Sequence, residues 1–390
     1  MIWYTAYKNM FGAGLRMWLN ATATAIALSL IIFTGGLYDG MRAYAKEVMI
    51  ATELGGGAYW HPEYDPTDPL TIDDAHGPMP PEISEAVSTG HLVPVLVVQG
   101  AIYPNGRLVS TLFKGIDPNQ TVLNMPTEVL RDYDGEFIPV LMGESMAKSA
   151  GLETGDIFVL RWRDELGSYD AADAQLVHVM STGNFRIDSG QLWLSIIDLD
   201  QMMGAQNIAT YAVADIGAAM DEAVGDWLPR DIDYLMADME ALIESDQAGA
   251  FLVYFLLIMM AALGIFNGQT LAIFRRVREI GTFQALGLTQ RQVVALFTLE
   301  SFMTGLVALA LSAIVGGPIL LWAAHTGIPL PYEGSDMGVV IAQRMAPVYT
   351  WPSVLKATGT ILAIIAVVSY LPARRIAKLH PTDALRGRGV

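Results

Sequence analysis

A short basic segment between two long apolar runs constrains this chain more than any other feature of its sequence. The segment 274–292 reads FRRVREIGTFQALGLTQRQ and holds four arginines and one acidic residue. The apolar runs 249–273 and 293–323 flank it. Each run exceeds the roughly 20 residues that a helix needs to cross a bilayer. A short arginine-rich loop between two spans is typical of a cytoplasmic turn.

Composition and charge support a membrane protein with a large domain outside the bilayer. The chain is 53% hydrophobic and 16% charged, which is too apolar for a soluble domain and too polar for a chain lying wholly in the membrane. Four spans are expected, at 20–38, 249–273, 293–323 and 354–371. Lysine and arginine gather in the short segments at both termini and in the basic loop, so both termini are expected in the cytoplasm. The net charge of −17 gives no reason to expect nucleic-acid binding.

The first part of the chain, 1–38, is expected to hold an interfacial amphipathic helix followed by the first span. Residues 1–19 combine aromatic and basic side chains, a pattern typical of a helix lying at the headgroups. A cleaved signal peptide is the alternative, because Ala43-Tyr44-Ala45 resembles a cleavage site. The apolar run is long for a signal, which favours a retained anchor.

Residues 39–248 are predicted to form a mixed α+β domain outside the membrane. The expected strands are Ala58–Trp60, Leu92–Ile102, Leu108–Ile116, Phe158–Trp162, Leu176–Met180 and Leu192–Ile196. The expected helices are Pro80–Ser88, Ser145–Ala150, Leu199–Met203, Ile216–Trp227 and Leu235–Ser245. The region 249–390 then supplies the second span, the loop 274–292, the third span, an outer loop at 324–353, the fourth span and a cytoplasmic tail.

The basic loop is predicted to be a docking helix for a soluble motor. Four side chains would share one face of a short amphipathic helix, namely Ile280, Phe283, Ala285 and Leu286. Gly281 and Gly287 would let the backbone approach a partner closely. A loop that only sets the topology is the alternative, and charge alone does not separate the two.

These residues resemble a known family signature. The run from Arg275 through Gly281, continued by Ala285-Leu286-Gly287, resembles the pattern R-x-R-E-I-G-x-x-x-A-L-G of FtsX-like (MacB-type) ABC transporter permeases. Further stretches that resemble this family, several of them landmarks of the lipoprotein-releasing LolC/LolE branch, are Gly115–Pro118, Met142–Asp156, Gly183…Asp188, Glu300 and Pro372…Arg386.

The resemblance implies the MacB-type permease fold: four transmembrane helices, with the α+β extracytoplasmic domain between the first and second. It also implies a permease dimer, with itself or with a sister permease, that docks on a dimer of separate ABC ATPase subunits. ATP and Mg²⁺ would be bound by that ATPase, so no catalytic residue and no cofactor is expected in this chain. The expected ATPase-coupling residues are Arg275, Arg276, Arg278, Glu279, Ile280, Gly281, Ala285, Leu286 and Gly287.

The same resemblance implies a substrate cavity for acyl chains between the first two spans. The residues expected to line it are Phe33, Leu37, Phe251, Tyr254, Phe255 and Met259. Glu300 is a costly charge inside the third span; we expect it to pair with Arg275, Arg276 or Arg291, while a proton or cation relay is the alternative. No metal site is expected, because the acidic segment around His76 lacks calcium-loop spacing.

The expected function is ATP-driven extraction of a lipoprotein or lipophilic substrate from the outer face of the bacterial inner membrane, with membrane lipids and a periplasmic carrier or adaptor as further partners. Two alternatives stay open. One is a drug or peptide exporter working with a periplasmic adaptor. The other is a mechanotransmitter that regulates a cell-wall hydrolase outside the membrane.

Overall fold

The computed structural model describes the chain except for residues 1, 13, 219, 221, 330–343 and 377–390. The described chain divides into two compact units. One is the outer unit, Ala43–Leu242. The other is the membrane unit, which contains the chain up to Arg42, Ile243–Pro329 and the chain from Arg344. Residues 330–343 of the expected outer loop 324–353 and most of the cytoplasmic tail, including the motif from Pro381 on, lie outside the described residues.

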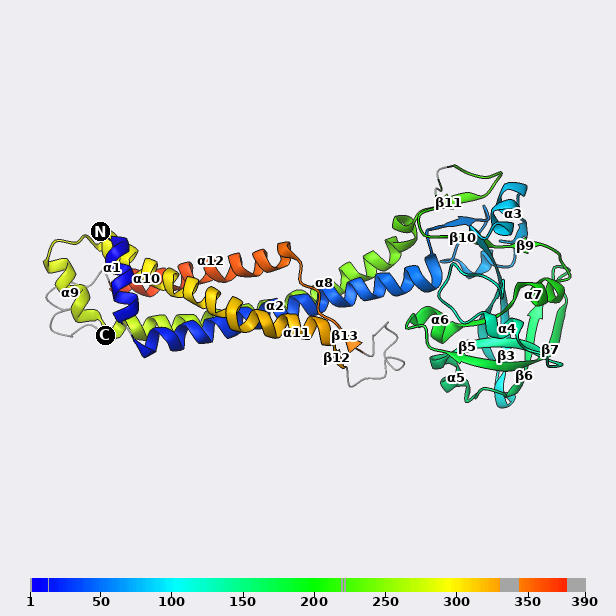
Figure 1. The fold of residues 1–390 in the computed structure, drawn as a ribbon, viewed down its shortest axis with the longest axis horizontal. Helices are drawn as coiled ribbons and strands as arrows, with labels where there is room; N and C mark the ends of the chain where they lie inside the picture. Colours follow the sequence, from blue (N-terminus) through cyan, green and yellow to red (C-terminus); the bar gives the residue numbers. More distant parts are fainter. Residues whose placement is uncertain (1, 13, 219, 221, 330–343, 377–390) are drawn as a thin grey trace. The chain divides into compact units, whose positions relative to one another are not determined.

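Long helices build the membrane unit (Figure 1). They are α1 (Ile2–Gly12), α2 (Leu15–Met49), α8 (Ile232–Arg275), α9 (Val277–Ala285), α10 (Gln290–Leu311), the π-helix η4 (Ser312–Gly316), α11 (Gly317–Thr326) and α12 (Trp351–Ile376). The strands β12 (Ile328–Pro329) and β13 (Arg344–Met345) pair beside them. Both α2 and α8 continue past the boundary of the unit.

Four helical stretches are long and apolar enough to cross a membrane, in agreement with the four expected spans. They are Met17–Leu54, Phe251–Arg275, Gln290–Thr326 and Trp351–Arg375. The first is 38 residues long, well beyond the roughly 20 that a bilayer requires. The expected first span therefore lies within a longer helix.

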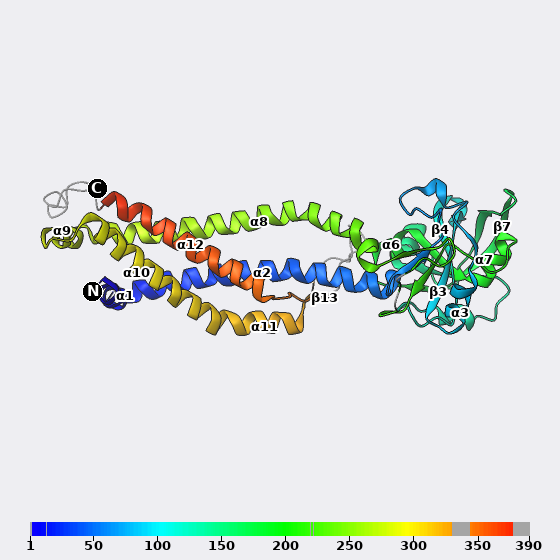
Figure 2. The same cartoon turned by 90° about the horizontal axis from the view of Figure 1, so that it is seen from above.

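Small and weakly polar residues bring the membrane helices together, as is usual where lipid leaves no hydrophobic driving force. The helices α10 and α12 lie side by side (Figure 2), and Ile365 fills the space at Gly305. Ser29 of α2 and Ser312 of η4 share a hydrogen bond of 2.8 Å. At Gly36 the α2 carbonyl accepts a 2.8 Å hydrogen bond from the Val348 amide. None of these three contacts involves a charged side chain.

The outer unit is built on one nine-stranded sheet. Its strands are β1 (Ala58–Trp60), β3 (Leu92–Tyr103), β4 (Val109–Ile116), β5 (Ile138–Gly143), β6 (Ile157–Arg163), β7 (Tyr169–Met180), β8 (Gln191–Ser195), β10 (Tyr211–Ala214) and β11 (Leu228–Arg230). Their order is β11-β1-β10-β3-β4-β8-β5-β7-β6. Because β6 also pairs with β3, the strands from β3 to β6 close on themselves. A separate short pair joins β2 (Gly77–Pro78) to β9 (Ile208–Ala209).

Short helices complete the outer unit. They are the π-helix η1 (Ile50–Leu54), η2 (Pro69–Thr71), α3 (Pro81–Ser88), η3 (Pro104–Gly106), α4 (Glu128–Arg131), α5 (Glu144–Ala150), α6 (Phe185–Gly190) and α7 (Ile196–Met203). The largest core cluster lies within the closed part of the sheet and includes Phe113, Leu160 and Trp162. Along β6 buried and exposed residues alternate, which is why this strand could be predicted from its pattern.

One helix expected in this unit is wrong. Between Ile216 and Trp227 the described residues form turns and a bridge of Val224 with Trp227. Gly217 and Gly225 have φ of 91° and 60°, values that end a helix.

Candidate functional site

The basic loop forms an elbow, defined here as residues 274–292. The helix α8 ends at Arg275, and Arg276 leaves the helical conformation with φ −108° before α9 begins. After α9 the chain turns at Gly287, where φ is 96°. Thr289 then starts α10 through a capping box with Gln292, in which each side chain bonds the other residue's backbone amide. The sequence thus fixes both ends of a short, separate helix.

The apolar side of α9 packs inside the chain. Its residues join a buried cluster with the ends of α8, α10 and α12; the cluster comprises Ile273, Val277, Ile280, Val293, Phe297 and Ala373. Ile280 is 1% exposed, and Gly281 is also buried. The expected docking face is therefore only partly exposed, because Ile280 and Gly281 are buried on the inner side of the elbow. Phe283 lies partly buried against the same cluster.

The remaining predicted coupling residues lie on the outside of the elbow. Those with exposed side chains or backbone are Arg275, Arg278, Glu279, Ala285, Leu286 and Gly287. Leu286, the C-cap residue of α9, is 74% exposed. This exposed face combines two arginines with an apolar tip, which suits a protein partner that offers both acidic and apolar groups.

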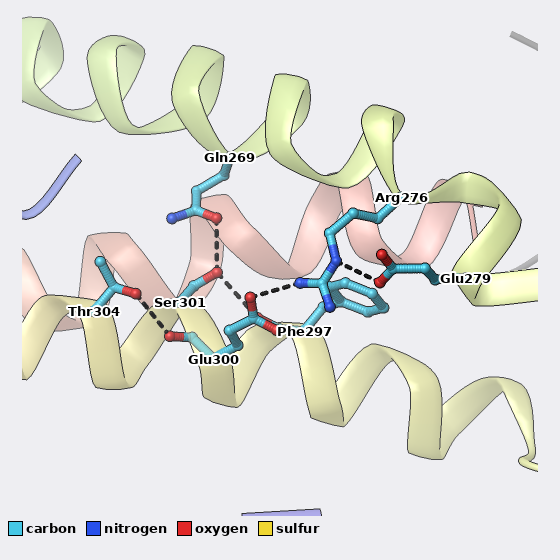
Figure 3. Close-up of polar contacts among 7 residues, drawn as sticks. All are labelled: Gln269, Arg276, Glu279, Phe297, Glu300, Ser301 and Thr304. Atoms are coloured by element: carbon cyan, nitrogen blue, oxygen red, sulfur yellow. Dashed lines mark hydrogen bonds and ion pairs between the residues drawn. The ribbon is translucent and has the colours of Figure 1, made fainter. Parts of the chain in front are cut away.

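Arg276 connects the elbow to the third span (Figure 3). Its Nη1 lies 2.6 Å from Glu300 Oε1, and its Nε lies 2.7 Å from Glu279 Oε2. The guanidinium also lies 5.0 Å from the centre of the Phe297 ring. The geometry agrees with the expectation that Glu300 pairs with an elbow arginine, and it identifies Arg276 as the partner. A fork-shaped guanidinium is suited to holding two carboxylates at once.

Hydrogen bonds extend this network along α10. Ser301 donates to Gln269 Oε1 of α8 at 2.9 Å, and Thr304 donates to the Glu300 carbonyl at 3.0 Å (Figure 3). The bond between Gln269 and Ser301 therefore joins α8 to α10 beside Glu300. Among the described residues no group of three or more histidine, aspartate or glutamate side chains is arranged to hold a metal ion.

A pocket of about 300 Å³ lies between α2, α8, α10 and α12. Its apolar wall includes Leu30, Ile31, Leu257, Met260, Ala261, Gly264 and Ile365. Its polar residues are Asn20, Thr24, Gln269, Ser301 and Thr304. The pocket thus joins the network that contacts Arg276, and it offers an apolar surface with a polar end.

The six residues expected to line a cavity are not among the lining residues of this pocket. Phe251 and Phe255 stack on each other with ring centres 6.3 Å apart, and both are exposed. The hydroxyl of Tyr254 occupies the space beside Gly35. Met259 is exposed one position away from the lining residue Met260. Phe33 and Leu37 are half-buried on α2. These six residues lie on the two helices that also line the pocket, α2 and α8, but they do not line it.

Landmarks of the outer unit come together in space. At Gly143 any side chain would meet the Asp188 backbone, with a Cβ 2.1 Å from its Cα. The Asp188 carboxylate accepts bonds from Thr182 Oγ1 at 2.8 Å and from the Gly183 amide at 3.1 Å. Burial raises the pKa of Asp188, although these bonds act in the opposite direction. The motif residues therefore pack the turn before α6 against β5.

Relatives of this chain include permeases of ABC transporters. Residues 251–381 match the FtsX-like permease C-terminal family, so this part of the chain is an FtsX-like permease domain. The chain is 21% identical over 312 residues to the lipoprotein-releasing system transmembrane protein LolC of Xylella fastidiosa, covering 73% of this chain and 75% of that protein. It is 26% identical to the macrolide export ATP-binding/permease protein MacB of Sodalis glossinidius, over 52% of this chain and 31% of that protein.

A third relative is an uncharacterized ABC transporter permease of Methanocaldococcus jannaschii, 27% identical over 44% of this chain and 41% of that protein. The expected resemblance to FtsX-like, MacB-type permeases close to LolC is confirmed. These relatives are named for lipoprotein release and for macrolide export, so the similarity extends to proteins with different substrates.

Proposed function

We propose that this chain is the membrane subunit through which a separate ATPase extracts a lipoprotein or another lipophilic substrate from the outer face of the bacterial inner membrane. The chain would act in a homodimer or heterodimer, with both termini in the cytoplasm. Its partner ATPase would bind the ATP and Mg²⁺. The observation that carries the proposal is the elbow of an FtsX-like domain, with an exposed outer face and a braced inner face.

The elbow is suited to receive force. A partner that holds the exposed face of α9 would move Ile280 and Val277, which pack against the ends of three spans. It would also pull on Arg276, whose guanidinium holds Glu300 of α10. A rigid-body shift of α9 would therefore reach α8 and α10 together, because packed interiors transmit displacement instead of absorbing it.

Exchanging an exposed leucine tests docking at this face. We expect Leu286→Asp to abolish co-purification of the ATPase and to lower ATP hydrolysis by the complex at least tenfold, while the permease still inserts. Leu166→Asp in the outer unit is the matched control, because Leu166 is 92% exposed but lies far from the elbow in sequence. Normal recruitment by the Leu286→Asp variant would contradict docking through this surface.

The topology has its own test. Reporter fusions are expected to place residue 150 outside the cytoplasm and residue 285 inside it. The opposite result would place the elbow outside the cytoplasm, where a cytoplasmic ATPase could not bind it, and would contradict the proposal.

Neighbouring methionines on α8 test the substrate. Met260 lines the interhelical pocket and Met259 does not, although both are exposed. A photo-crosslinking residue at position 260 should capture acyl-bearing molecules more efficiently than one at position 259. Methionine adapts to irregular apolar guests, which suits this position.

Export of a drug or peptide with a periplasmic adaptor is the second candidate, favoured by the similarity to a macrolide export protein. Capture of soluble peptides alone at position 260 would favour it. A mechanotransmitter that controls a cell-wall hydrolase is the third. Absence of any captured molecule, together with normal ATPase recruitment, would favour that reading.

A further inference from the structure

The outer end of α2 is seated directly on the sheet of the outer unit. After Met49 the helix continues as the π-helix η1, in which the Ala51 carbonyl accepts a 2.7 Å bond from the Asn124 amide. The Gly56 amide then donates to the Ala214 carbonyl of β10 at 2.7 Å. A Cβ at Gly56 would lie 2.1 Å from the Asp215 carbonyl oxygen. Only glycine lets the helix end lie this close to the sheet.

A buried charge lies at this junction. Glu53 is the one acidic residue of η1, and its side chain is 11% exposed. The Lys114 Nζ of β4, 5% exposed, lies 3.7 Å from Glu53 Oε1. Asn184 Nδ2 donates to Glu53 Oε2 at 3.0 Å and to Thr52 Oγ1 at 3.3 Å. The carboxylate therefore has a cation on one oxygen and an amide donor on the other.

Aromatic rings surround the cation and continue to the start of α8. Lys114 Nζ lies 5.0 Å from the Trp193 ring centre and 5.7 Å from that of Tyr211. Tyr211 stacks on Tyr64, which meets Trp60 edge-on. Trp60 in turn meets Tyr234 of α8 at 5.9 Å. The end of α2 and the start of α8 thus share one aromatic layer on the sheet.

We infer that Glu53, Lys114 and Asn184 form a latch that fixes the rotational position of α2 on the outer sheet. Apolar contacts are non-directional, so they do not by themselves select one rotational position of a helix end. A buried ion pair resists turning, because any displacement leaves both charges unpaired in a medium of low dielectric constant. The inference rests on the proposed function, in which the ATPase would twist α2. With the latch in place, that twist would turn the sheet, and the helix end would not slip over it.

Hydrogen exchange of the full chain in nanodiscs tests the latch. The variants are Glu53→Gln, Lys114→Met and the double variant, which removes both charges and leaves none unpaired. In all three, the Gly56 and Asn124 amides are expected to exchange at least tenfold faster. The matched control is Arg163→Met with Asp73→Asn, which removes an ion pair of the same unit whose side chains are 52% and 46% exposed. Exchange at the wild-type rate in the folded double variant would overturn the latch.

A second readout separates the latch from mere stabilisation. With the ATPase bound, ATP is expected to change the exchange of amides in β3 and β4 in the wild type and in the control. The double variant should lose at least four-fifths of that response while ATP hydrolysis continues. A full response in the double variant would overturn the inference. A wild type that never responds to ATP would count against the proposed function, whereas the Gly56 and Asn124 rates would still decide whether the latch holds α2.

Discussion

Among the described residues, the membrane unit and the outer unit each have an ion pair largely removed from solvent, and the two pairs are built alike. In the membrane unit Arg276 pairs with Glu300 and lies 5.0 Å from the Phe297 ring centre. In the outer unit Lys114 pairs with Glu53 and lies 5.0 Å from the Trp193 ring centre. In both, a carboxylate on a helix meets a cation that an aromatic ring shields.

Their surroundings differ, and the difference suits different tasks. Lys114 is sealed within the sheet, whereas the Arg276 side chain is 22% exposed and also holds Glu279, which is 55% exposed. The elbow pair thus connects a surface that a partner can reach with the inside of the helix bundle. The outer pair reaches no such surface and is suited only to holding its own elements together.

The largest expected effect is on the sealed pair. Lys114→Met removes the cation paired with the buried Glu53 and leaves that carboxylate only the Asn184 amide and the charge of Arg186, which should lower the free energy of unfolding by up to about 3–5 kcal/mol. Denaturant unfolding in mild detergent measures this change. Adding Glu53→Gln should recover most of the loss. If the double variant is as unstable as Lys114→Met, the pair is not the source of the cost.

A second test asks whether close backbone packing at a glycine helps to hold α2 in the membrane unit. Gly40→Ala would place a Cβ 2.2 Å from the Ala346 carbonyl oxygen, so the backbone must shift, at a cost of about 1–3 kcal/mol. Gly359→Ala on α12 is the matched control, because no atom lies within 4 Å of its Cβ position. Thermal unfolding should separate the two variants. Equal stabilities would show that the glycine contact on α2 is not close-packed.

How far the sequence predicts these contacts depends on how each is made. Glu300 lies in a span next to an arginine-rich loop, so an elbow arginine was the expected partner, and chain proximity made Arg276 accessible. Lys114 and Glu53 are brought together by the pairing of β3 with β4 and β10, and nothing local signals that pairing. The partner of Glu53 could therefore not be predicted.

The same reasoning applies to the elbow and the pocket. The amphipathic pattern of α9 predicted an apolar face, but the pattern does not say whether a partner or the chain itself covers it; here Ile280 is covered by the chain. On α8 the apolar residues run all round the helix, so Met259 and Met260 could not be told apart. Strand β5 was not predicted; its last four residues are all buried, so it lacks the alternation seen in β6.

The third prediction concerns the fork of Arg276. Lysine keeps the charge but has no rigid pair of donors, so Arg276→Lys cannot hold Glu300 and Glu279 in the same geometry. We expect ATP hydrolysis by the assembled complex to fall about tenfold, equivalent to roughly 1.4 kcal/mol. Arg278→Lys is the control, because the exposed Arg278 would keep its charge at the docking face. Equal activity of the two variants would show that the fork plays no part in coupling.

The smallest effect is expected for the exposed ion pair between Arg276 and Glu279. Glu279→Gln removes a pair at 2.7 Å whose carboxylate is more than half exposed, and such pairs contribute about 0.2–1 kcal/mol. The loss should shrink at 1 M salt, where the screening length falls to about 3 Å, while the cost of Lys114→Met should not. Unfolding of the permease without its ATPase, at low and high salt, measures both. If high salt reduces the loss of unfolding free energy equally for Glu279→Gln and Lys114→Met, the Lys114–Glu53 pair is as open to solvent as the Arg276–Glu279 pair. The two sites would then not differ in their access to solvent.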